Sequence, residues 1–449
     1  MKKSKNTIDM THGTLWNKIL LFALPLAASS ILQQLFNSVD TAVVGRFASS
    51  RALAAVGSTS SFISLMINLF IGISLGSNVV IAHYIGQKVE KNIQAAIHTA
   101  ITVALIGGCF VMILGQFIGR PVLILMGTPE DVIDLAVQYL RIYFLGMPFI
   151  LLYDFGSSIL RSTGDSRRPL YSLIVAGILN TVLNLILVIV FQMGVAGVAI
   201  ATVVSNIVSS GIVMWILMRE PEPVRFTLRK LTINGKELWK ILSIGVPAGL
   251  QGMVFSLANV CIQSTINSFG SDAVAGSAAA LNYEFFAYFI VNAFAQTTVT
   301  FTSQNYGAGE YDRCRKIFRI NMTFSMVFCG LLSAVFVLGR SFFLGLYTTD
   351  ASVLGYATTR LVIATTLELL TSTYEISGGA MRGLGHSLQP ALITVFGSCV
   401  LRLIWISTAC VAVHEFWVLI IIYPISWVVT GIIMIVSYLR LRKKMLIKN

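Results

Sequence analysis

The first long apolar stretch of the chain is residues 17–46, NKILLFALPLAASSILQQLFNSVDTAVVGR. It exceeds the roughly 20 residues that an α-helix needs to cross the hydrocarbon core of a bilayer. One carboxylate, Asp40, lies inside it. Because a charged side chain at membrane depth is energetically costly, such a residue is by default a candidate for function. The stretch therefore predicts a transmembrane helix that carries a functional acid.

Stretches of this kind recur along the whole chain. Of the 449 residues, 56% are hydrophobic and 11% are charged, and the mean hydropathy is +0.81. A soluble chain carries about 25% charged residues, so a soluble globular fold is excluded. We predict an all-α polytopic membrane protein with twelve transmembrane helices. They cover residues 17–46, 53–82, 93–117, 132–158, 169–191, 194–218, 239–269, 273–303, 316–339, 352–378, 390–412 and 417–439.

The net charge of +13 is explained by where the basic residues lie. With both termini in the cytoplasm, most of the 32 Lys and Arg residues fall in cytoplasmic segments. These segments are 1–18, 84–92, 161–168, 219–240, 310–319 and 440–449. Such a bias is the positive-inside signature of a multi-pass protein of the cytoplasmic (inner) cell membrane. The basic charge therefore indicates membrane topology, and we expect no nucleic-acid partner.

The chain lacks the residue patterns of a metal site or a catalytic centre. Its six Cys residues form no CxxC pair, and its five His residues are scattered. No arrangement of Ser and His for nucleophilic catalysis is suggested either. We therefore expect no metal, no enzymatic activity, and no cofactor beyond a coupling ion.

Two stretches at an offset of 221 residues, 153–169 and 374–390, are similar to each other. Asp154 aligns with Glu375 as an acid. The identical positions are Tyr153 and Tyr374, Arg161 and Arg382, Gly164 and Gly385, Ser166 and Ser387, and Pro169 and Pro390. This predicts a duplicated half, with an N-terminal six-helix lobe (1–218), a cytoplasmic linker (219–238) and a C-terminal six-helix lobe (239–449). Two such pseudo-symmetric lobes are expected to enclose a central cavity in which the substrate is handled.

Polar residues of three predicted helices fall at similar depth around Asp40. Asn180 and Asn184 are four residues apart and therefore share one helix face, while Thr202 lies at a similar depth on the next helix. A carboxyl in low-dielectric surroundings favours its neutral form, so Asp40 can load and release a proton. The alternative is that Asp40 lies at the watery outer end of its helix, or pairs with Arg46. The predicted proton- or cation-coupling site is Asp40, Asn37, Asn180, Asn184 and Thr202.

The second half does not repeat Asp40, since Cys261 and Ile262 stand at the aligned positions. Glu284 has no obvious partner in the sequence and lies among polar residues, so we predict a substrate-cavity acid that binds cations. The predicted cavity residues are Gln34, Asn259, Gln263, Asn282 and Glu284. Glu368 and Arg402 lie at similar depth, and a buried ion pair is the alternative to a role in binding cargo. The predicted structural or gating residues are Asp154, Arg161, Glu368, Glu375, Arg382 and Arg402.

The first helix, from Leu24-Pro25 through Gln33-Gln34 to Asp40 and Arg46, resembles that of bacterial multidrug and toxic compound extrusion (MATE) transporters. The residues 54–57, 160–166, 307–309 and 381–385 are also similar to this family, and the resemblance covers the whole chain. It implies two six-helix lobes and export of organic cations or other amphiphiles against an inward flow of protons or sodium ions. In the branch with an aspartate in the first helix, that acid couples transport, which here corresponds to Asp40.

One departure from the family concerns the coupling ion. Archaeal and some bacterial members carry a second acid on the fifth helix, where this chain has Asn184. The seventh-helix acid of another branch is missing as well, because residues 247–263 contain no Asp or Glu. Both differences favour protons over sodium ions.

These observations predict a secondary active multidrug antiporter that works by alternating access. It would export organic cations or amphiphiles in exchange for protons, with Na⁺ as the alternative ion, and it would function as a monomer. The other candidate is a flippase for a lipid-linked precursor. Arg141, Arg360 and Arg402 keep this alternative open, because such a cargo would need a cationic cavity.

Overall fold

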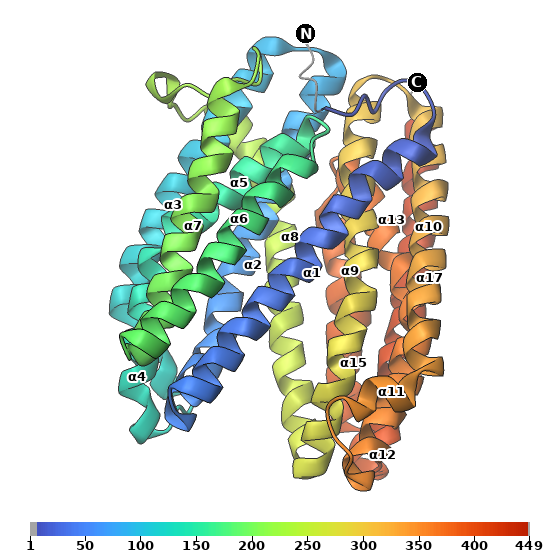
Figure 1. Ribbon diagram of the computed structural model, residues 1–449. Helices are drawn as coiled ribbons and strands as arrows, with labels where there is room; N and C mark the ends of the chain where they lie inside the picture. The colour runs from blue at the N-terminus through green and yellow to red at the C-terminus, as the bar shows by residue number, and fades with distance from the viewer. Residues whose placement is uncertain (1–6, 448–449) are drawn as a thin grey trace. The chain divides into compact units, whose positions relative to one another are not determined.

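The computed structural model describes residues 7–447, which form helices and connecting loops with no strand among them (Figure 1). Each of the twelve predicted stretches contains a helix or a series of helices. Eleven helices in the described part are long and apolar enough to cross a membrane, and one bent helix pair supplies a twelfth span. The predicted all-α polytopic membrane fold is confirmed.

The chain divides into two compact units. Unit 1 comprises the chain up to Asp9 together with Leu24–Gly249, and unit 2 comprises Met10–Ala23 together with the chain from Leu250 onward. The boundary between the units therefore runs through two helices, α1 (Leu15–Phe47) and α8 (Gly235–Asn267). The division into 1–218, 219–238 and 239–449 made from the sequence stays a prediction.

In unit 1, helix α5 packs against α2, α3 and α7, and α6 packs along α7. Apolar residues dominate these helices. Their bounds are α2 (Ser50–Gln87), α3 (Glu90–Leu125), α4 (Glu130–Leu145), α5 (Met147–Ser162), α6 (Arg167–Asn184) with the π-helical turn η1 (Leu185–Val190), α7 (Gly194–Arg219) and the short 3₁₀ turn η2 (Leu228–Lys230).

In unit 2, helix α9 packs against α10, α12 and α13, and α13 packs against α17. The bounds are α9 (Ser271–Gly307), α10 (Tyr311–Leu338), α11 (Arg340–Gly345), α12 (Ala351–Arg360), the π turn η3 (Leu361–Thr365), the 3₁₀ turn η4 (Glu368–Leu370), α13 (Thr371–Gly383), α14 (Leu388–Thr394), the π turn η5 (Val395–Val400), α15 (Leu401–Ser407), α16 (Ala409–Ala412) and α17 (Phe416–Ile447).

The predicted helix 132–158 is in fact two helices, α4 and α5, which meet at an angle of 48°. The break lies at Gly146, and Pro148 follows within the first turn of α5. Proline has no backbone N–H, and at the start of a helix that group needs no partner inside the helix. The sequence Gly146-Met147-Pro148 thus ends one helix and starts the next.

Three spans contain a π-helical turn, at 185–190, 361–365 and 395–400. The first two turns directly follow Asn184 and Arg360, and the third ends two residues before Arg402. π-Helical turns occur often at functional sites, where they turn a side chain out of the regular helical register. The π-helical turns therefore mark these three residues as candidates for function.

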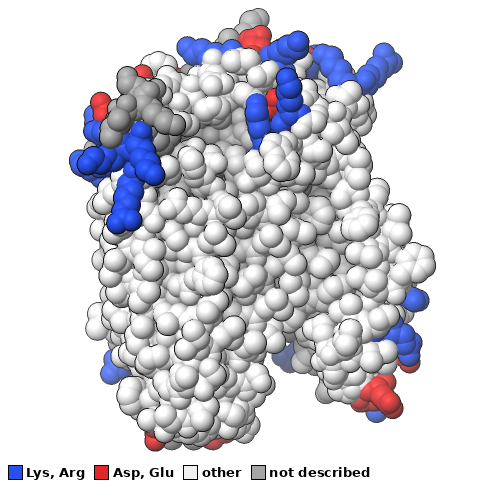
Figure 2. Space-filling view, turned by 180° about the vertical axis from the view of Figure 1, so that it is seen from behind, with Lys and Arg blue, Asp and Glu red and all other residues white. Residues whose placement is uncertain are grey.

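Charge is distributed as expected for helices in a bilayer. Figure 2 shows helix flanks almost free of charged side chains, with Lys and Arg gathered at the helix ends. Exposed basic residues at helix ends and in loops include Arg167, Arg229 and Lys230 in unit 1 and Arg440 and Lys443 in unit 2. Basic residues at span ends and in loops are typical of membrane proteins.

Helices α2 and α8 approach each other closely within unit 1 because glycines face each other. A Cβ atom at Gly72 would lie 2.1 Å from the backbone nitrogen of Gly249, and one at Gly76 would lie 2.3 Å from the carbonyl oxygen of Ile241. Gly72 and Gly76 are four residues apart, as are Gly245 and Gly249. This is the small-residue spacing that permits close helix packing in membranes.

We therefore expect Gly72→Ala to lower the free energy of unfolding by about 1–3 kcal/mol, the usual cost of overpacking. The methyl group would meet backbone atoms, which can move only if the helices separate. The matched control is Gly57→Ala in the same helix, where a Cβ meets nothing within 4 Å. Thermal unfolding in detergent should show a lower midpoint for Gly72→Ala alone, and equal midpoints for the two variants would contradict the packing argument.

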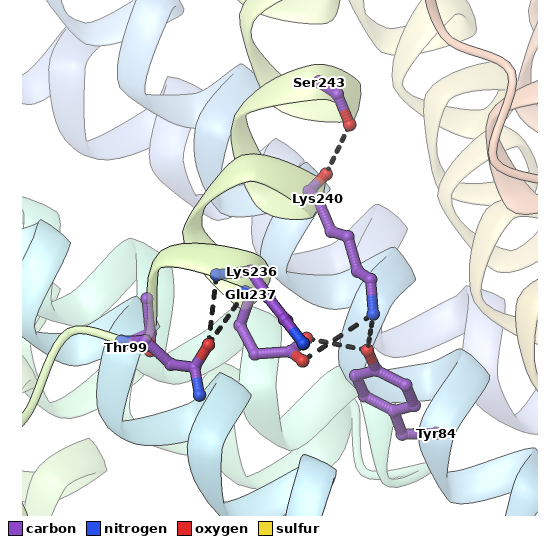
Figure 3. Close-up of polar contacts among 7 residues, drawn as sticks. Tyr84, Thr99, Lys236, Glu237, Lys240 and Ser243 are labelled. Atoms are coloured by element: carbon purple, nitrogen blue, oxygen red, sulfur yellow. Dashed lines mark hydrogen bonds and ion pairs between the residues drawn. The ribbon is translucent and has the colours of Figure 1, made fainter.

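A polar cluster ties the start of α8 to α2 and α3 (Figure 3). The Tyr84 hydroxyl donates to Oε2 of Glu237 at 2.7 Å and accepts from the Lys240 ammonium. Lys240 also lies 3.6 Å from Glu237, whose side chain is buried. The backbone N–H of Asn234 donates to the Thr99 hydroxyl at 3.1 Å. The Tyr84 hydroxyl thus links two charged side chains, those of Glu237 and Lys240.

Tyr84→Phe should lower the free energy of unfolding by about 1–3 kcal/mol, because the buried Glu237 carboxylate loses a donor without gaining another. The ring keeps its volume, so packing is unchanged. Tyr171→Phe is the control, since Tyr171 is 57% exposed. Thermal unfolding midpoints of the two variants should differ; a Tyr84→Phe midpoint equal to that of wild type would show that the hydroxyl adds no stability.

Candidate functional site

Asp40 lies at the centre of a polar cluster formed by α1, α6 and α7 in unit 1. Nδ2 of Asn184 donates to Oδ1 of Asp40, and the same nitrogen lies 3.2 Å from Oδ1 of Asn180. Nδ2 of Asn180 in turn lies 3.5 Å from the Thr202 hydroxyl. Asn184 and Asn180 are buried, while Asp40 is half-buried. The structure thus brings together four of the five residues predicted for the coupling site.

The fifth residue, Asn37, is exposed on α1 and makes no side-chain hydrogen bond to the cluster within residues 7–447. The alternative that Asp40 pairs with Arg46 is not supported, since no ion pair within 4.0 Å joins them in the described structure. The coupling role of all five residues stays a prediction.

The buried amide of Asn184 can serve both protonation states of Asp40. Its Nδ2 donates to the ionised carboxylate, while its Oδ1 has no hydrogen-bond partner among the described residues. A protonated Asp40 has an O–H group that can donate to this free acceptor. The pair can therefore hold Asp40 in either protonation state, and protonation of Asp40 supplies the buried Oδ1 of Asn184 with a donor.

Unit 2 contains a cavity of about 220 Å³ among α8, α9, α12, α13, α15 and α17. Its polar and charged lining is Asn259, Gln263, Glu284, Tyr288, Arg360, Glu368, Thr371, Tyr374, Arg402 and Tyr423. Its apolar lining is Phe255, Ile262, Ile266, Leu281, Phe285 and Trp427. Asn259, Gln263 and Glu284 of the predicted substrate cavity thus share one cavity.

The other two predicted cavity residues lie elsewhere. Gln34 is a half-buried residue of α1 in unit 1, and Asn282 is exposed on α9, where it donates to the carbonyl oxygen of Ala278 at 3.0 Å. Asn282 precedes Glu284 by two residues, so the helix turns it to a different face. The roles of all five in binding cargo stay predictions.

The expectation that Glu284 lacks a partner is wrong. Its two carboxylate oxygens accept from Nε and Nη2 of Arg360 at 2.7 and 2.9 Å, which is a bidentate ion pair. Nη1 of Arg360 donates to the Ser277 hydroxyl at 2.6 Å. Because Arg360 neutralises Glu284, this acid has no free charge for a cation. Arg360 could have been found from the sequence by depth, since both residues lie within about four turns of the same end of their spans.

The alternative of a buried Glu368–Arg402 ion pair is not observed. Nε of Arg402 donates to the Ser426 hydroxyl at 3.0 Å, and its guanidinium lies 4.5 Å from the ring centre of Tyr423. Within the described residues no ion pair shorter than 4.0 Å joins Arg402 to Glu368. Both side chains nevertheless line the same cavity. The aromatic partner Tyr423 carries no sequence pattern that would have identified it.

Of the four predicted structural or gating residues in the two repeats, Arg161, Glu375 and Arg382 form hydrogen bonds to residues outside the two acid–arginine pairs. Nε of Arg161 donates to the carbonyl oxygen of Ser157 at 3.2 Å, and Asp154, which is half-buried, lies about two helical turns before Arg161. In unit 2 Glu375 accepts from the Tyr288 hydroxyl at 3.2 Å, and Nη2 of Arg382 donates to the side-chain carbonyl of Gln251 at 2.7 Å. These contacts fit a structural role, and a gating role stays a prediction.

Comparison with known proteins identifies the family. The MatE family model matches residues 25–186 and 247–406. The probable multidrug resistance protein YoeA of Bacillus subtilis is 31% identical over 402 residues, which cover 88% of this chain and 85% of that protein. The probable multidrug resistance protein NorM of Thermotoga maritima is 26% identical over 86% of this chain and 84% of its own.

Solved structures agree on the fold. An outward-facing multidrug resistance MATE family transporter superimposes with a TM-score of 0.92 over the full length of both chains, at 23% identity. The family match falls separately on each half of the chain, in line with the duplication seen in the sequence. The protein belongs to the multidrug and toxic compound extrusion (MATE) family of membrane transporters.

Proposed function

We propose that this protein exports organic cations or other amphiphilic compounds in exchange for protons. The observation that carries the proposal is the hydrogen-bonded cluster of Asp40, Asn184 and Asn180, in which a single carboxyl lies among neutral groups. A lone acid with amide partners suits a proton, because its charge is not cancelled by a neighbouring base. The names of the relatives YoeA and NorM, both probable multidrug resistance proteins, support a small-molecule cargo.

The Asp40 cluster favours a proton over a sodium ion because it contains a single carboxylate. A dedicated Na⁺ site is better stabilised by two carboxylates than by one, and Asn184 stands where a second acid would be needed. In the described part of the chain no group of three His, Cys, Asp or Glu side chains is placed to hold a metal ion. The proposal includes a location in the cytoplasmic membrane, with both termini in the cytoplasm, and activity as a monomer.

The test is uptake of ethidium into proteoliposomes that have an acidic lumen and no sodium. Ethidium is permanently charged, so it does not accumulate as a weak base, and potassium with valinomycin holds the membrane potential at zero. Outward proton flow should drive saturable uptake that a protonophore abolishes. A sodium gradient of the same size, imposed without a pH difference, should drive none.

Two results would count against the proposal. Uptake driven only by the sodium gradient would replace the proton as coupling ion. No uptake with either gradient, by protein that elutes as a single species and unfolds cooperatively, would remove cation export and favour a different cargo.

A further inference from the structure

The cavity of unit 2 contains four charged residues, of which only two neutralise each other. Glu284 and Arg360 form the bidentate pair described above, and their side chains are 7% and 2% exposed. Glu368 and Arg402 are the remaining two, and they are 4% and 1% exposed. The cavity thus presents one unpaired acid and one unpaired base to whatever occupies it.

Arg402 has a donor that the protein does not satisfy. Nε donates to Ser426, but Nη2 is buried and has no hydrogen-bond partner within the described residues. The guanidinium lies 4.5 Å from the ring centre of Tyr423 and 5.4 Å from that of Phe255. The two aromatic rings make cation–π contacts with the guanidinium. The N–H groups of Nη2, however, still lack a hydrogen-bond acceptor. An anionic oxygen is the partner that a guanidinium binds most strongly.

Glu368 offers the complementary charge. Its side chain makes no hydrogen bond or ion pair with another described residue, although it lines the cavity. An ionised carboxylate buried without a partner is costly, and so is a buried guanidinium with a free donor. Both costs fall if one molecule supplies a cation to Glu368 and an anion to Arg402.

Charge balance then selects the ligand. A ligand that carries both charges supplies an anionic group to Arg402 and a cationic group that stabilises the ionised form of Glu368, whereas a simple cation or a simple anion supplies only one of the two. We propose that this cavity binds an aromatic zwitterion of about amino-acid size, with its anionic group on Arg402 and its cationic group on Glu368. The apolar wall of Phe285, Trp427 and Ile262 would receive the ring.

The size of the cavity agrees with such a ligand. Its volume of about 220 Å³ is the volume that roughly seven molecules occupy in liquid water, at about 30 Å³ each. This suits one bicyclic ring with a short side chain. The inference goes beyond the cation export proposed above and does not depend on it.

The test uses four indole compounds that share a two-carbon side chain and differ in the charged groups attached to it. They are tryptophan (zwitterion), indole-3-propionate (anion), tryptamine (cation) and 3-ethylindole (neutral). Binding of tritiated tryptophan to purified protein in detergent is measured by scintillation proximity, and the other three serve as unlabelled competitors. We expect tryptophan to bind at least tenfold more tightly than each of the other three.

Variants of Arg402 and Glu368 test which charged group of the ligand each residue binds. Arg402→Gln should weaken tryptophan binding at least tenfold and should remove any preference for indole-3-propionate over 3-ethylindole. Glu368→Gln should remove the preference of the cavity for tryptophan over indole-3-propionate. Arg340→Gln, at an exposed position, is the control and should bind as wild type does. If Arg402→Gln does not fold, Arg402→Met serves as the second variant, because it keeps a long side chain and leaves no polar group of its own buried without a partner.

Three outcomes would overturn the proposal. They are equal competition by all four compounds, tryptophan binding that survives in both folded Arg402 variants, and no binding by stable wild-type protein. Because no ion gradient enters this test, its failure leaves the proposed proton-coupled export standing. In the same way, a failed ethidium experiment leaves the binding result untouched.

Discussion

Asp40→Asn is expected to reduce proton-driven ethidium uptake to the level of protein-free liposomes, while the protein still folds and inserts. The substitution keeps the shape of the side chain and removes its only titratable group. The cluster has room for the change, because Oδ1 of Asn184 lacks a partner among the described residues and can accept from the new amide. The variant therefore mimics the proton-loaded state and cannot release a proton.

The transport assay needs a matched control and a folding control. Asp272→Asn makes the same chemical change at an exposed position in the first turn of α9, and it should transport as wild type does. The thermal unfolding midpoint of Asp40→Asn should equal or exceed that of wild type, since a half-buried charge is gone and its hydrogen bonds remain. Proton-driven uptake by the Asp40→Asn variant at the wild-type rate would show that Asp40 is not the proton carrier.

The Asp40 cluster could be predicted from the sequence because it depends on regular helix geometry alone. Asn180 and Asn184 are four residues apart in an uninterrupted α-helix, so they share a face, and their depth follows from the rise per residue. Nothing in α6 breaks that register before Asn184. The regular part of this span ends at Asn184, where the π turn begins.

The cavity of unit 2 could not be predicted in the same way. Its charged residues Arg360, Glu368 and Arg402 lie next to π-helical or 3₁₀ turns, at 361–365, 368–370 and 395–400. A π turn inserts an extra residue into a helical turn and rotates every following side chain to a different face. Helical projection therefore fails for Glu368 and Arg402, which lie beyond the turns at 361–365 and 395–400, whereas Arg360 precedes its turn and could have been paired with Glu284 by depth.

Glu284→Gln should lower the free energy of unfolding by about 3–5 kcal/mol, the usual effect of removing one partner from a buried ion pair. It leaves Arg360, which is 2% exposed, with a neutral amide in place of its bidentate carboxylate. Arginine cannot shed its charge at any accessible pH, so the cost is not relieved by loss of a proton. Unfolding in dodecyl maltoside titrated with dodecyl sulfate measures the change.

The double variant Glu284→Leu/Arg360→Met decides whether the loss comes from the uncompensated charge or from the loss of packing. Replacing both members of a buried ion pair with apolar residues of similar volume is often neutral or stabilising. We therefore expect the double variant to be far more stable than Glu284→Gln and close to wild type, with a large favourable coupling between the two positions. If it is instead as unstable as the single variant, the two side chains contribute through shape and through the Ser277 contact of Arg360. In that case Glu284 and Arg360 would not act as a neutral unit, and the charge balance of the cavity would have to be assigned anew.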